Sequence, residues 1–251
     1  MFYRIILIIF ILSTPLIGYA QDDRLRTTGK FEFNTTSAEI LGEEYAINYE
    51  EVLAPDESIK WTVHVPENYD PAYPPGLIVH ITERNLAILP FGWNTALKEK
   101  NLIWISLNKT GRLTPNKEML LSVLSTAFID IKYPINTDRI YISSIMESCI
   151  SASAAMQFYP TIFKGVIYTS CLPINWKNDI PNTIEEMKNN RYVFISGSDN
   201  NLEREMRRMV RKYENSGLEK IQYINIPQLA YGKNLNRRRL IEFIEFLDTR
   251  D

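Results

Sequence analysis

Histidine is almost missing from this chain, which has two, His64 and His80, among its 251 residues. Both lie in strand-like runs, where a packed or edge histidine is much more common than a catalytic one. The chain also lacks a strong excess of either sign of charge, because 28 basic and 30 acidic residues give a net charge of −2. This balance gives no reason to expect nucleic acid or an acidic membrane as a partner. Neither an internal repeat nor a low-complexity tract interrupts the sequence.

Cysteine is equally sparse, with two residues, Cys149 and Cys171. Cys149 falls in the first turn of a predicted helix, and Cys171 falls just past the end of the next predicted strand. These places are close together in a parallel sheet, so a disulfide is compatible with the geometry if the protein is exported. Two buried free thiols are the alternative, and the sequence leaves both open.

The first twenty residues have the pattern of a secretory signal peptide. Arg4 precedes an apolar run from Ile5 to Leu12. In Gly18-Tyr19-Ala20, small residues stand three and one positions before Gln21, which predicts a cut after Ala20. The run is short for a membrane span of about 20 residues, although an uncleaved anchor is the alternative. We therefore expect a secreted or periplasmic protein with a signal peptide at 1–20, a polar N-terminal arm at 21–58 and one domain at 59–251.

Strand-like and helix-like runs alternate through that domain. Short apolar runs predict buried parallel strands, and apolar residues at helical spacing predict the helices between them. The predicted strands are 59–65, 76–81, 102–107, 139–143, 165–170, 191–196 and 220–226, and the predicted helices are 93–100, 116–131, 147–159, 201–215 and 234–248. This order predicts an α/β fold with a mostly parallel central sheet and helices on both faces. The link from Leu172 to Asn190 is too short for a separate lid domain.

The segment from Arg139 to Ser170 has the form of a strand, a sharp turn and a helix. In a serine hydrolase such a turn carries the nucleophile, with small residues two positions before and two after it. Ser144 and Ser148 meet that steric need around Met146, whose thioether cannot attack a carbonyl. Frames centred on Ser148 or Cys149 fit the turn less well.

Two further loops follow strands at the same sheet edge, where sites of parallel sheets lie. The first contains Asp199, whose carboxylate could orient a histidine, although an N-cap of the following helix is the favoured interpretation. The second contains Tyr231 where a general base would be expected to be histidine. A tyrosine with a pKa near ~10 is a poor base at neutral pH.

The chain resembles the secreted α/β-hydrolase esterases related to polyhydroxybutyrate depolymerases and feruloyl esterases. The segments that carry the resemblance are Val65–Tyr69 with Pro74–Val79, Ile135–Ile142, Phe158-Tyr159-Pro160 with Phe163 and Gly165, and Pro227. Met146 lies fourteen residues before Pro160, as the serine of that family lies before its Tyr-Pro proline. The resemblance implies an α/β-hydrolase fold in which the Ser…Asp…His order becomes Met146…Asp199…Tyr231.

The oxyanion hole also departs from the family pattern. The family usually has a His-Gly-type turn after its first central strand, whereas Ile81–Asn85 contains no glycine. Thr82 and Glu83 would stand where backbone N–H groups face the substrate oxygen. Carboxylates at Glu83 and Glu147 would repel a developing oxyanion.

These residues together predict a pseudo-hydrolase that binds without turnover, because two of the three triad positions lack a usable group. Its pocket would be formed by Thr82, Glu83, Met146, Glu147 and Tyr231. An esterase-type hydrolase with a displaced nucleophile, Ser148 or Cys149, is the alternative. We expect an unknown small-molecule or polymer ligand and allow for a protein partner. We expect no nucleic acid, no membrane contact beyond the signal peptide, no cofactor and no metal.

Overall fold

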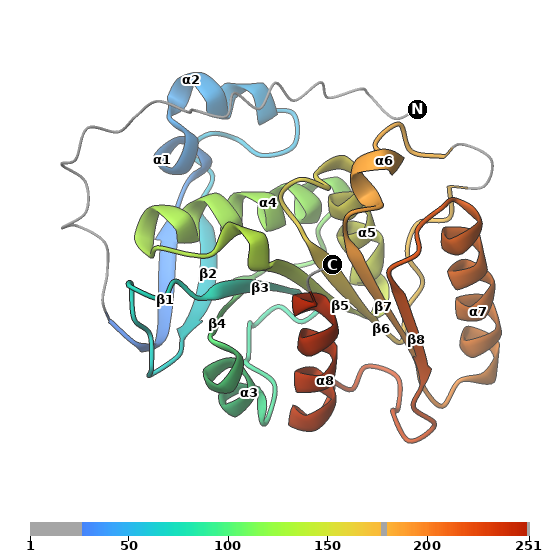
Figure 1. Cartoon of the computed structure of the whole chain (residues 1–251). Coiled ribbons are helices and arrows are strands. Elements are labelled where there is room, and N and C mark those ends of the chain that lie inside the picture. The colour runs from blue at the N-terminus through green and yellow to red at the C-terminus, as the bar shows by residue number, and fades with distance from the viewer. Residues whose placement is uncertain (1–26, 177–179, 250–251) are drawn as a thin grey trace.

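The computed structural model describes residues 27–176 and 180–249. The predicted signal peptide, residues 1–20, lies outside the described residues. The described chain forms one sheet covered by helices (Figure 1).

The sheet has eight strands in the order β1-β2-β4-β3-β5-β6-β7-β8. β2 runs antiparallel to β1 and to β4, and the remaining pairs are parallel. The strands are β1 (Gly29–Thr35), β2 (Ile59–Val65), β3 (Gly76–Ile81), β4 (Leu102–Asn108), β5 (Ile140–Ile145), β6 (Gly165–Thr169), β7 (Arg191–Ser196) and β8 (Ile221–Asn225). The predicted mostly parallel sheet is therefore confirmed.

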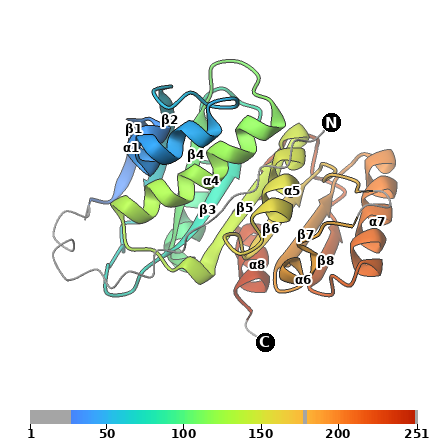
Figure 2. The ribbon, with the colours of Figure 1, turned by 90° about the horizontal axis from the view of Figure 1, so that it is seen from above.

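The central strands are buried on both faces, which explains why they are continuous apolar runs. Every residue of β3, β5, β6 and β7 is buried. One face of the sheet packs under α4 (Pro115–Lys132), α5 (Cys149–Phe158) and α7 (Asn200–Asn215), and the other packs under α3 (Trp93–Lys100) and α8 (Arg237–Asp248). Figures 1 and 2 show this arrangement, with α4 and α5 side by side on one face.

Short helices complete the described chain. They are α1 (Ser37–Leu41), α2 (Glu43–Ala46), η1 (Ile47–Tyr49), η2 (Thr137–Arg139), η3 (Met146–Ser148) and α6 (Ile184–Met187). In the link between β6 and β7, α6 is the one helix that the described residues contain. None of the helices within 27–176 and 180–249 combines the length and the apolar character that a bilayer crossing needs.

The polar segment predicted as an N-terminal arm contributes to the sheet. β1 pairs along its length with β2, and Phe31 and Phe33 lie opposite Val63 and Trp61. The ring of Phe33 also packs edge-on against Phe128 of α4, with centroids 5.3 Å apart. The folded unit therefore begins before the boundary that the sequence suggests at residue 59.

Candidate functional site

The sharp turn between β5 and α5 places Met146 at its apex. Met146 has a φ of +60°, in the left-handed region that non-glycine residues rarely adopt. Such a conformation costs roughly 1–2 kcal/mol for a residue with a side chain. The flanking Ser144 and Ser148 are fully buried, and their small side chains let the turn close against its neighbours. The backbone of a nucleophile elbow is thus present, with a thioether at its apex.

The loop after β8 lies against this apex. The Sδ atom of Met146 is 3.3 Å from the position that a Cβ on Gly232 would take, and Gly232 has a φ of +74°. Tyr231 precedes Gly232 and is about half exposed, at 54%. The structure therefore brings the backbone beside Tyr231 into contact with the side chain of Met146.

The loop after β7 touches the loop after β8 through the backbone. The N–H of Ser198 donates to the carbonyl of Leu229 at 3.0 Å. A Cβ on Gly197 would collide with that same carbonyl oxygen. All three loops that the sequence singles out therefore lie next to one another at the carboxyl edge of the sheet.

Asp199 itself caps a helix. Its Oδ1 atom accepts the N–H groups of Asn201 at 2.8 Å and Leu202 at 3.1 Å, which is the N-cap that the sequence favours. Its loop reaches the site, while these two bonds hold the carboxylate at the start of α7.

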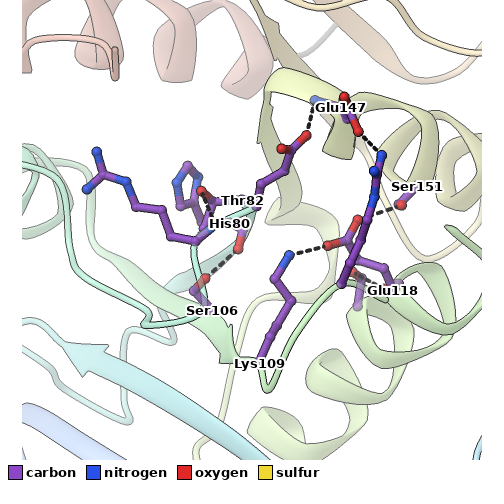
Figure 3. Close-up of polar contacts among 11 residues, drawn as sticks. His80, Thr82, Ser106, Lys109, Glu118, Glu147 and Ser151 are labelled. Carbon is purple, nitrogen blue, oxygen red and sulfur yellow. Dashed lines mark hydrogen bonds and ion pairs between the residues drawn. The ribbon is translucent and has the colours of Figure 1, made fainter. Parts of the chain in front are cut away.

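Two carboxylates lie beside the elbow, those of Glu83 and Glu147. The N–H of Glu147, the group after the elbow apex, donates to Oε1 of Glu83 at 2.6 Å. The carboxylate of Glu147 in turn pairs with the exposed guanidinium of Arg112 (Figure 3). A hydrogen bond from a backbone N–H to a carboxylate is charge-assisted and stronger than one to a neutral carbonyl. Glu83 therefore accepts the hydrogen bond of the N–H that would stabilise an oxyanion in a hydrolase.

Tyr231 lies within the field of both carboxylates. Partial burial raises the pKa of its phenol above the usual value, and the charges of Glu83 and Glu147 raise it further. The phenol is therefore protonated at neutral pH and can donate a hydrogen bond, but it cannot accept a proton as a histidine would.

The two histidines lie outside this group. His80 of β3 is fully buried, and desolvation lowers its pKa to about 4, although its bond to Ser143 opposes that shift. Its ring therefore stays neutral at physiological pH. His64 of β2 is hydrogen-bonded to Asn94 of α3 at 2.8 Å.

Below the elbow lies a buried ion pair that the sequence analysis does not identify. Lys109, just after β4, pairs with Glu118 at 2.9 Å, and the hydroxyl of Ser151 donates to the other carboxylate oxygen at 2.6 Å (Figure 3). A cavity of about 20 Å³ lies beside it, and His80 and Thr82 form part of the lining. Both Lys109 and Arg112 follow a strand at the carboxyl edge, so the rule that locates the other loops could have found them.

Cys149 and Cys171 form a disulfide in the structure, with Cα atoms 6.0 Å apart. The bridge joins the first residue of α5 to the segment after β6. The neighbouring Ser148 hydroxyl is buried and finds no hydrogen-bond partner among the described residues.

No cluster of three or more His, Cys, Asp or Glu side chains that could hold a metal ion occurs in residues 27–176 and 180–249. The groups that the elbow region gathers are two carboxylates, a phenol, a thioether and backbone N–H groups.

No family model and no curated protein matches the sequence. Solved structures do match. A thermostable esterase superposes with a TM-score of 0.62 at 15% identity, covering 86% of this chain and 60% of its own. A ferulic acid esterase superposes with a TM-score of 0.60 at 12% identity, covering 87% of this chain and 98% of its own. An S-formylglutathione hydrolase from Staphylococcus aureus superposes with a TM-score of 0.58 at 9% identity, covering 88% of this chain and 99% of its own.

Some neighbours are longer proteins, of which the chain matches a part. It spans 33% of the dipeptidyl peptidase 4 of Porphyromonas gingivalis, at a TM-score of 0.56. At these identities the similarity is one of fold. The chain has the α/β-hydrolase fold, and its structural neighbours are esterases and peptidases of that fold.

Proposed function

We propose that this is an exported α/β-hydrolase-fold protein that binds its ligand at the elbow without turning it over. The observation that carries the proposal is the contact between Glu83 and the N–H of Glu147, next to an elbow whose apex is Met146. A hydrolase needs that N–H free to receive the oxyanion and a nucleophile at the apex.

The electrostatics support the same conclusion. A negative charge that develops beside Glu83 and Glu147 is repelled, while Arg112 balances one of the two carboxylates. At the base position, Tyr231 has a pKa above its ordinary value. Removing triad members costs factors of about 10⁴ to 10⁶ in rate. Residual turnover is therefore slight.

The ligand would bind between the loops after β3, β5 and β8. Thr82, Glu83, Met146, Glu147 and Tyr231 would form its surroundings. These groups offer carboxylate acceptors, one phenol donor and an apolar thioether, a set that serves a small molecule or a polymer chain.

Two observations count against the alternative, a hydrolase with a displaced nucleophile. Ser148 is 1% exposed, so its hydroxyl does not face a substrate. The sulfur of Cys149 is bonded to that of Cys171, and a disulfide sulfur is not a thiolate.

Covalent labelling tests the proposal. The purified native protein is incubated with a fluorophosphonate and weighed intact. It is then treated with iodoacetamide near neutral pH, without reductant and after mild reduction. We expect no adduct from the fluorophosphonate and none from iodoacetamide before reduction. A stoichiometric adduct that forms without reductant and disappears in Ser148→Ala or Cys149→Ser would establish the displaced nucleophile instead.

Export is part of the proposal and depends on residues 1–20. The N-terminus of protein recovered from the extracytoplasmic fraction of a bacterial host would be determined by mass spectrometry. A mature chain that begins at Gln21 supports it, and full-length protein in the cytoplasm contradicts it.

A further inference from the structure

The loop that joins β3 to α3, residues 82–92, leaves three large apolar side chains in solvent. Leu86 is 61% exposed, Ile88 55% and Phe91 fully exposed. An isolated exposed apolar residue is normal on a protein surface, but three in six positions of one loop form a local patch. This patch begins three residues after Glu83, so it lies beside the proposed ligand site.

The exposure does not come from a poorly anchored loop. Ala87 is buried, and its N–H donates to Oδ1 of Asn108 at 2.8 Å. The carbonyl of Asn85 accepts the N–H of Lys109 at 2.7 Å, and Pro90 is buried. These two hydrogen bonds and two buried residues therefore anchor the loop backbone. The three apolar side chains are exposed although the loop that carries them is anchored.

Arginines lie near both ends of this loop. Arg84 lies in the same loop and is exposed. The backbone of Gly92, next to Phe91, faces the first turn of α8, and a Cβ on Gly92 would lie 3.5 Å from the Cβ of Arg237. Arg238, also exposed, follows on that turn. Figure 1 shows α3 and the start of α8 together at the lower end of the molecule.

The position of these arginines is costly for the helix itself. The first turn of α8 carries no acidic residue, and Arg237, Arg238 and Arg239 stand at its positive end. A helix dipole favours anions at this end and disfavours cations. Glu99 pairs with Arg237 and Glu242 with Arg239, and no ion pair of Arg84 or Arg238 occurs among the described residues. Counted with Glu83, which precedes Arg84, the charges next to the patch therefore still leave an excess of arginine, although the chain has a net charge of −2.

We propose that this loop and the first turn of α8 form a docking surface for an anionic phospholipid membrane. Apolar side chains that enter the acyl boundary, with arginines at headgroup level, are the combination that interfacial binding needs. A second copy of the chain fits less well, because a twofold contact through this patch would bring the same arginines of both copies together. The proposal does not depend on whether the elbow is inert. It revises the expectation drawn from net charge, which averages over the whole surface.

Vesicle partitioning tests this surface. The purified protein is sedimented with vesicles of equal parts phosphatidylglycerol and phosphatidylcholine, and with vesicles of phosphatidylcholine alone. We expect partitioning onto the anionic vesicles that weakens as salt is added. The double variant Ile88→Ser/Phe91→Ser should partition about tenfold more weakly. The charge variant Arg84→Gln/Arg238→Gln should partition about thirtyfold more weakly on anionic vesicles, because each arginine contributes about 1 kcal/mol.

Matched controls separate this surface from general stickiness. Tyr45→Ser/Ile47→Ser removes two other large exposed side chains, 60% and 54% exposed, at α2 and the start of η1, on the opposite side of the molecule (Figure 1). Arg204→Gln/Arg211→Gln removes two exposed arginines of α7. Both controls should partition like the parent, and all proteins carry the same N-terminus, so any contribution of the leader is shared. No partitioning by the parent, or equal losses in the controls, overturns the proposal. So does a parent dimer that Ile88→Ser/Phe91→Ser converts to monomer in sedimentation velocity, because a second copy then covers the patch.

Discussion

The carboxylate of Glu83 accepts the backbone N–H of Glu147 at 2.6 Å, across 64 positions of sequence. This contact joins the loop after β3 to the elbow and places a carboxylate on the N–H that would stabilise an oxyanion in a hydrolase. Under the function proposed above, introducing a nucleophile and a base alone leaves this N–H bonded to Glu83.

That relationship predicts an order of activities for engineered variants. Met146→Ser/Tyr231→His supplies a serine and a histidine, with the loop of Asp199 behind them, and should hydrolyse p-nitrophenyl acetate slightly above the parent. Adding Glu83→Ala frees the N–H, and one oxyanion donor is worth about 10²–10³ in rate. We expect the triple variant to exceed the double variant by at least about tenfold. Equal rates in folded double and triple variants would show that Glu83 does not block the site.

The contact between the loops after β7 and β8 predicts that one added methyl group lowers the free energy of unfolding substantially. Gly197→Ala would drive its Cβ into the carbonyl oxygen of Leu229, a backbone atom that cannot turn aside. Overpacking of this kind costs about 1–3 kcal/mol. Gly111→Ala is the control, because Gly111 has a φ of +80° but open space around it, so it tests backbone strain alone. Urea unfolding should show a greater loss for Gly197→Ala. A loss no larger than that of Gly111→Ala would mean that the loops are apart.

The buried pair of Lys109 and Glu118 predicts non-additive substitutions. Their side chains are 5% and 11% exposed. Lys109→Met leaves the Glu118 carboxylate buried without its cation, which costs about 3–5 kcal/mol. Lys109→Met/Glu118→Leu removes both charges and should recover most of that loss. A double-mutant cycle in urea measures the coupling, and additive losses would contradict the pairing.

His80 predicts a loss of stability in mild acid. Its pKa in the folded state is lowered to about 4, so between about pH 6.5 and pH 4 the unfolded chain binds a proton that the folded chain does not. The contribution of His80 is complete above the unfolded pKa and falls as the pH drops, by about 3 kcal/mol in all.

Urea unfolding at a series of pH values measures this slope. His80→Gln should flatten the slope between pH ~6.5 and ~4, whereas His64→Gln, which removes the other histidine, should keep it. The same slope in His80→Gln and the parent would assign the pH dependence to other groups.

The sequence predicted most of the sheet because its central strands are buried on both faces and therefore stand out as apolar runs. It missed β1, where Phe31 and Phe33 alternate with Lys30, Glu32 and Asn34 at the sheet edge. That short alternation becomes a strand through pairing with β2, which lies about thirty residues away.

Some features of the candidate site could likewise be predicted from the sequence, and others could not. The apex at Met146 could be predicted because a strand, a turn and a helix are contiguous in sequence. Glu83 and Glu147 were both expected near the oxyanion position, but the hydrogen bond between them depends on how distant loops pack. The ion pairs of Arg112 with Glu147 and Lys109 with Glu118 likewise depend on tertiary structure, because neither partner carries a local signal for the other.

Ester turnover by the unaltered protein tests the central claim most directly. Purified protein is mixed with p-nitrophenyl butyrate over a range of concentrations, and Ser148→Ala is measured beside it. With a thioether at the elbow and a carboxylate on its N–H, we predict a rate equal to that of buffer without protein. Saturable turnover by the native protein, lost on unfolding or in Ser148→Ala, would contradict the account.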